Sequence, residues 1–83
     1  MGATLKILLK IMTFEEKLQS LGFTLCEGGS YENYINDNSV EITLRENGNI
    51  VLVVYNEETE EEILREYRSS APVMRIINKL INK

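Results

Sequence analysis

Residues 40–55 read VEITLRENGNIVLVVY, and this stretch decides the fold. Apolar and polar residues alternate before Asn47-Gly48, and an unbroken apolar run begins two residues after it. Such alternation is typical of a strand with one buried face. Asn-Gly between two such runs favours a hairpin, because a type I′ turn needs positive φ at both central residues. The sequence therefore predicts antiparallel strands over 40–46 and 49–55.

A two-residue loop also sets the register of this hairpin. It predicts three apolar cross-strand pairs: Leu44 with Val51, Ile42 with Val53, and Val40 with Tyr55. A shift by one residue would turn every side chain to the other face of the sheet. A three-residue turn with a bulge would make that shift and would mix polar with apolar partners, so the two-residue turn is preferred.

The second strand of the hairpin is apolar on its other face as well. Ile50, Leu52 and Val54 lie there, as in a strand that is covered on both faces. We expect these residues to be covered by residues 3–11 or by a second copy of the chain. The candidate interaction surface is therefore Ile50, Leu52, Val54, Leu5, Ile7 and Leu9.

Residues 1–11 fit more than one structure. Their apolar residues follow helical spacing and period-two spacing equally well, so periodicity does not choose between a helix and a strand. If Met12 is the natural start, the first eleven residues are an extension outside the core domain of 12–83.

A short helix is predicted over 13–21. Thr13 and Glu16 form a capping box, in which the hydroxyl accepts a backbone N–H and the glutamate reaches back. Phe14, Leu18 and Leu21 then share one face, and Gly22 can end the helix in the left-handed conformation. Strands are predicted next over 23–27 and 31–36, separated by Gly28-Gly29-Ser30 and followed by a turn over 36–38.

Two helices are predicted after the hairpin. Asn56 can cap the first, whose glutamates lie near the positive end of the helix dipole. Pro72 opens the second. Its apolar residues recur at helical spacing, which also makes it another candidate dimer surface: Val73, Ile76, Ile77, Leu80 and Ile81.

The predicted fold class is α+β, in a single domain over 1–83. A short N-terminal helix precedes a four-stranded antiparallel meander, and two C-terminal helices pack on one sheet face. That face carries Val40, Ile42, Leu44, Val51, Val53 and Tyr55.

Composition excludes several chemistries. The chain has no histidine, so catalytic pairs and metal sites that use His are impossible, and Cys26 is the single cysteine. We expect no cofactor, because no glycine-rich phosphate motif occurs. The formal charge of −4 disfavours nucleic-acid binding, and no apolar run is long enough to cross a membrane. One cysteine agrees with a cytoplasmic location.

The order of elements resembles small uncharacterised proteins of phages and prophages from low-GC Gram-positive bacteria. The resemblance spans roughly residues 12–83, from Ser20-Leu21-Gly22-Phe23 through 31–35 and Val40-Glu41-Ile42 to Ile76-Ile77-Asn78. The break at 69–72 departs from it, since one C-terminal helix is typical there. The resemblance implies no activity and no catalytic residues.

These features predict a non-enzymatic accessory protein that binds other proteins through a sheet edge or an acidic helix, as a homodimer. The alternative is an acidic mimic or antitoxin-like regulator that binds a basic partner. A third hypothesis, a carboxylate enzyme with a hard metal ion, is disfavoured because the glutamates of 57–62 cluster on one element.

Overall fold

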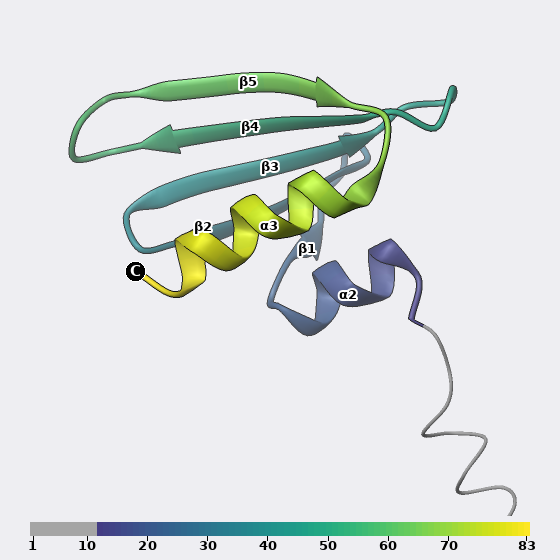
Figure 1. The fold of residues 1–83 in the computed structure, drawn as a ribbon, viewed down its shortest axis with the longest axis horizontal. Helices are drawn as coiled ribbons and strands as arrows, with labels where there is room; N and C mark the ends of the chain where they lie inside the picture. Colours follow the sequence, from purple (N-terminus) through teal and green to yellow (C-terminus); the bar gives the residue numbers. More distant parts are fainter. Residues whose placement is uncertain (1–11) are drawn as a thin grey trace, which may run out of the picture.

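In the described part of the chain, five antiparallel strands follow one another in sequence and in space, and two helices accompany them (Figure 1). The computed structural model describes residues 12–83. The strands are β1 (Thr24–Leu25), β2 (Ser30–Ile35), β3 (Asn38–Leu44), β4 (Ile50–Asn56) and β5 (Glu62–Tyr67). The helices are α2 (Phe14–Ser20) and α3 (Ser70–Ile81). An α+β fold with an antiparallel sheet is confirmed, but the arrangement predicted within that class is wrong.

The first correction concerns residues 57–67, which were predicted to be a helix. They form a turn and then β5, which pairs with β4 from Ile50↔Tyr67 to Tyr55↔Glu62. The Asn56 side chain accepts bonds from the backbone N–H groups of Glu58 and Thr59 at 3.0 and 2.8 Å, so it caps a turn rather than a helix. The sheet therefore has five strands, and one helix follows it instead of two.

The second correction concerns the register of β3 and β4. Leu44 pairs with Ile50, Ile42 with Leu52, and Val40 with Val54. The loop has three residues, since Arg45 N–H bonds the Asn49 carbonyl at 2.8 Å and Gly48 N–H bonds the Arg45 carbonyl at 3.0 Å. Gly48 has φ +89° whereas Asn47 is not among the residues with positive φ, so the turn is the bulged three-residue type.

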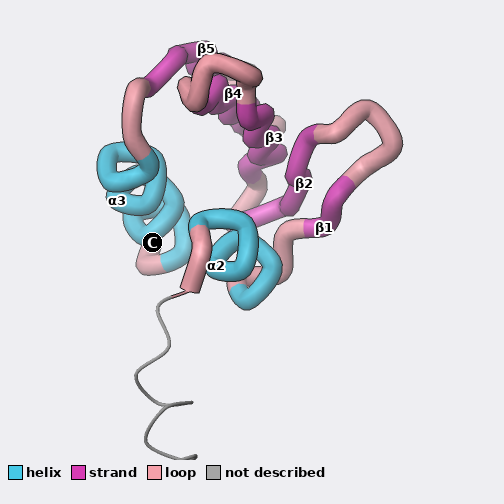
Figure 2. Tube along the Cα trace, turned by 90° about the vertical axis from the view of Figure 1, so that its right-hand side faces the viewer, coloured by secondary structure: helices cyan, strands magenta, loops and turns pink. Residues whose placement is uncertain are grey.

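This register places the core on the other face of β4. Ile50, Leu52 and Val54 are 5%, 0% and 5% exposed, and they join Val40 and Ile42 under the helices. The helices contribute Leu18 of α2 and Val73 and Ile77 of α3, and the remaining members of the core are Phe23, Tyr31 and Ile35. Both helices lie on this one side of the sheet (Figure 2). The prediction that Val51, Val53 and Tyr55 form the packed face is therefore wrong.

The N-terminal helix follows its predicted signals. Thr13 and Glu16 form both bonds of the capping box, at 2.9 and 3.1 Å. Gly22 has φ +97°, and a Cβ added there would lie 3.3 Å from the Asn33 side-chain nitrogen. That nitrogen donates to the Leu21 carbonyl at 3.1 Å, which ties the helix end to β2.

Candidate protein-interaction surface

One face of the sheet carries neither of the helices described within residues 12–83, and we call it the open face (Figure 2). Side chains alternate between the two faces of a strand, so the neighbours of the core residues point to this side. On β4 these are Val51, Val53 and Tyr55, all half-buried. The rest of the open face comprises Thr24, Ser30, Glu32, Tyr34, Ser39, Glu41, Thr43, Glu62, Leu64 and Glu66.

An apolar stripe crosses the open face at its β4–β5 side. Val53 pairs directly with Leu64 of β5, and Leu64 is 66% exposed. Every other residue of β5 is also exposed except Tyr67, which is half-buried. Single exposed apolar residues are ordinary, but Leu64 continues the row of Val51 and Val53 from β4 onto β5, and these three residues are the apolar stripe. Among the described strands β5 is an edge strand, to which a neighbouring strand could add.

Carboxylates border the apolar stripe on both sides. Glu62 and Glu66 flank Leu64 along β5, while Glu32 and Glu41 lie on β2 and β3. Glu32 and Glu41 are direct cross-strand neighbours, an arrangement in which like charges destabilise a sheet. A cation placed between them would relieve this repulsion. The open face is thus suited to a positively charged binding partner.

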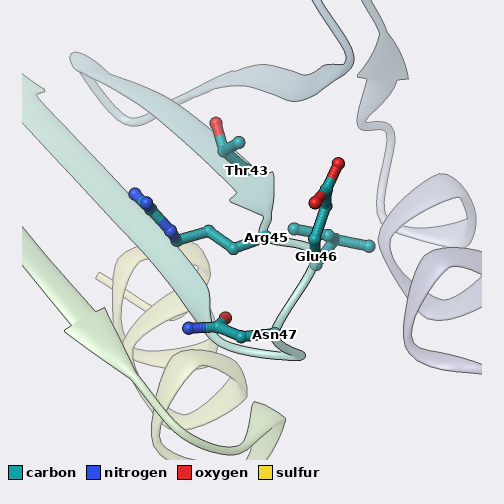
Figure 3. Close-up of a pocket in the computed structure, with 5 residues that line it drawn as sticks. Thr43, Arg45, Glu46 and Asn47 are labelled. Carbon is teal, nitrogen blue, oxygen red and sulfur yellow. The ribbon is translucent and has the colours of Figure 1, made fainter.

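The open face has one basic residue near its end. Arg45 follows Thr43 at period two, and Figure 3 shows both side chains at the β3–β4 hairpin. They line an open hollow together with Leu44, Glu46 and Asn47. All five residues come from one short segment, and within residues 12–83 no other element contributes a group to the hollow. This arrangement does not resemble the enclosed, convergent sites that bind small molecules.

A second hollow lies where the β4–β5 turn approaches the end of α3. Its volume is about 220 Å³, and Asn38, Asn56, Glu61, Leu80 and Lys83 are among the residues that line it. The buried Asn38 amide donates to the carbonyls of residues 35 and 36, and its oxygen accepts from Asn56 Nδ2 at 3.0 Å. These bonds join two turns, so the amides already have a structural role.

Cys26 lies beside the acidic residues of the open face. The pKa of its thiol is raised, and the largest cause is desolvation. A hydrogen bond with Glu32 and the negative charges of Glu32 and Glu41 raise it further. Its Sγ lies 3.6 Å from the Thr24 carbonyl. A nucleophilic cysteine needs the opposite environment, one that stabilises the thiolate. Its surroundings therefore favour the neutral, less reactive form.

The structure places the predicted surface residues in two groups. Ile50, Leu52 and Val54 are part of the core and are not exposed in the described chain. Leu5, Ile7 and Leu9 lie outside the described residues. The acidic run 57–62, predicted as a binding helix, is a turn that leads into β5, so Glu62 lies on a strand. Sequence reasoning missed Leu64 and Glu66, because the apolar residues of 63–67 fit a helix. The signal that could have found them is the apolar strand 50–55, which needed a further neighbour.

Comparison of the chain with family models, curated proteins and solved structures finds no match. The resemblance to phage and prophage proteins therefore stays a prediction. Within residues 12–83, no group of three or more Cys, Asp or Glu side chains is arranged to hold a metal ion. Neither described helix has the length and apolar character needed to span a membrane.

Proposed function

We propose that this chain is a non-enzymatic accessory protein that binds another protein with its open face and the adjoining β5 edge. The observation that carries the proposal is the one-sided placement of α2 and α3, since no described element covers Val51, Val53 and Leu64. Apolar surface removed from water contributes roughly 25 cal/mol per Å². A partner that covers this stripe would therefore gain binding free energy directly.

The surrounding carboxylates define the charge of that partner. The open face carries one basic residue, Arg45, and four glutamates: Glu32, Glu41, Glu62 and Glu66. Complementary charge raises the rate of association and excludes acidic competitors. An acidic mimic or antitoxin-like regulator would use the same surface. Its binding would depend mainly on charge and would be lost at high salt, whereas binding centred on the apolar stripe would persist.

The predicted homodimer stays a prediction, and so does the cytoplasmic location. Of the surfaces predicted for the homodimer, Ile50, Leu52 and Val54 lie in the core, and Leu5, Ile7 and Leu9 lie outside the described residues. The apolar side of α3 packs on the sheet, with Val73 and Ile77 fully buried and Ile76 and Leu80 against the core. Among the described surfaces, self-association would therefore use the open face or β5. The four carboxylates of the open face would then approach the same four on the second copy, which disfavours this arrangement. Light scattering on a dilute sample tests it, and a mass of twice 9.5 kDa would favour the homodimer.

The proposal is tested by affinity capture from a lysate of the source cells with three matched baits. The first is the wild-type chain, and the second carries Val53→Ser and Leu64→Ser on the open face. The third carries Leu25→Ser and Ile81→Ser, which change two exposed apolar residues elsewhere. We expect a specific protein that the first and third baits retain and the second loses. Capture that is absent, or equal for all three baits, would overturn the proposal.

A further inference from the structure

Among residues 12–83, β5 is the outermost strand of the sheet, and its backbone is set up to accept another strand. Asn56 N–H bonds the Glu61 carbonyl at 2.9 Å, which makes these residues a hydrogen-bonded pair at the start of the β4–β5 ladder. In an antiparallel ladder the hydrogen-bonded residues alternate, so Ile63, Arg65 and Tyr67 direct their N–H and C=O groups towards β4. The residues between them direct theirs to the other side. Glu62, Leu64 and Glu66 therefore present three donors and three acceptors at the edge.

The same three residues also place their side chains on the open face. Strand alternation puts Glu62, Leu64 and Glu66 on the side away from the helices. Glu66 is held there by the Asn49 side chain, whose Nδ2 lies 2.7 Å from Glu66 Oε2. A strand added to β5 would thus meet outward backbone groups and an acidic–apolar–acidic row at once.

A second copy of the chain does not fit this edge well. If Leu64 faces Leu64 across a two-fold axis, Glu62 of each copy faces Glu66 of the other, and like charges directly opposite destabilise a sheet. If Leu64 instead faces Glu66, the two copies of Arg65 lie opposite each other. If Leu64 faces Glu62, each apolar side chain meets a carboxylate. Charge along β5 therefore opposes self-pairing.

We propose that β5 pairs with an extended segment of a partner protein in which a basic, an apolar and a basic residue alternate with residues of any type. The basic side chains would lie opposite Glu62 and Glu66, and the apolar one opposite Leu64. Main-chain hydrogen bonds supply affinity in such strand addition, and alternate side chains supply specificity. The row on β5 reads the same in both directions, so parallel and antiparallel partners both match it. This inference rests on the proposed function and names the chemistry of the partner.

The probe is a synthetic seven-residue peptide, Thr-Lys-Thr-Leu-Thr-Lys-Thr, with blocked ends. It is titrated to millimolar concentration into the ¹⁵N-labelled full chain, and amide shifts and hydrogen exchange are followed by NMR. We expect shifts at β5, with slower exchange of the amides of Glu62, Leu64 and Glu66. A control peptide, Thr-Thr-Lys-Leu-Lys-Thr-Thr, has the same composition but places both lysines next to the leucine, on the opposite face of the added strand, and we expect binding at least about fivefold weaker.

Two variants, each with a matched control, separate the contribution of backbone hydrogen bonds to peptide binding from the contribution of charge. Leu64→Pro removes an outward N–H without removing a bond to β4, because proline is tolerated where the N–H faces solvent. Leu64→Thr keeps that N–H and serves as its control. The double variant Glu62→Gln, Glu66→Gln should weaken peptide binding about fivefold at low salt. Its control is the double variant Glu15→Gln, Glu27→Gln, which makes the same charge change away from β5 and should leave peptide binding unchanged.

Each result has one meaning for the proposal. Protection of the three amides, with loss of binding in Leu64→Pro beyond that in Leu64→Thr, supports strand addition. Peptide shifts at Val51 and Val53 without amide protection at β5 would overturn it, as would no shifts or equal binding of the control peptide. If the peptide fails while capture still depends on Val53 and Leu64, the strand-pairing inference falls and the proposed function stands. If the peptide binds and capture fails, the proposed function falls.

Discussion

The two faces of β4 are equally apolar, yet they have different surroundings. Ile50, Leu52 and Val54 lie under the helices and are almost fully buried. Val51, Val53 and Tyr55 lie on the open face and are half-buried. Hydrophobicity alone therefore does not show which face of a strand is packed. The difference comes from the turn and from the helices, and we propose that the second face is kept apolar for binding.

The largest expected effect is the difference in stability between Leu52→Ala and Val53→Ala. Leu52 is fully buried, so truncation should leave a cavity and lower the free energy of unfolding by about 2–5 kcal/mol. Val53 lies on the open face, and its truncation should cost about 1 kcal/mol or less. Urea unfolding followed by circular dichroism measures both values. Equal losses would mean that the two faces of β4 are packed alike.

The hairpin turn should give the next largest effect. Gly48 has φ +89°, so Gly48→Ala should cost about 1–2 kcal/mol of unfolding free energy. The φ angle of Asn47 is not positive, and Asn47→Ala loses only the hydrogen bond that its Oδ1 accepts from Asn49 N–H, at about 1 kcal/mol or less. In a type I′ turn both residues need positive φ. Similar costs for both variants would therefore favour the alternative register and reverse the two faces.

Local signals predicted the parts of the fold that one short segment determines. The capping box at Thr13 and the glycine at Gly22 give α2 within one residue at each end. The turn over 36–38 is also observed, with Asn36 and Asp37 both at positive φ. In each case the deciding hydrogen bond or backbone angle belongs to residues close together in the sequence.

Signals that need a distant partner were misjudged. Because residues 50–55 are all apolar, Val40, Ile42 and Leu44 find apolar partners in either register, and pairing could not choose between them. Residues 63–67 contain apolar positions that fit a helix, but the free edge of β4 offers a ladder of hydrogen bonds to a strand. The candidate site on β5 depends on that ladder, so the same error hid Leu64 and its flanking glutamates.

The smallest expected effect concerns the ionisation of Tyr34, on the open face. The Tyr34 hydroxyl donates to Glu57 Oε2 at 2.8 Å, and this hydrogen bond is the largest cause of a raised phenol pKa, followed by desolvation and the charges of Glu57 and Asp37. We expect the phenolate absorbance of Tyr34, isolated by subtracting a Tyr34→Phe titration, to rise at lower pH in Glu57→Gln. An unchanged titration would mean that this bond does not hold in solution.

The sign of the accompanying change in stability follows from the direction of the shift. A raised pKa means that the folded chain binds this proton more tightly, so the contribution is complete below the ordinary tyrosine pKa of about 10 and is lost as pH rises through the folded pKa. Tyr34→Phe should lack this alkaline loss. Because Tyr34 lies on the open face, its ionisation should leave the circular dichroism of the sheet unchanged. A sheet that unfolds in step with the phenolate signal would instead place Tyr34 in a packed layer, and the contrast between the two faces would fail at this position.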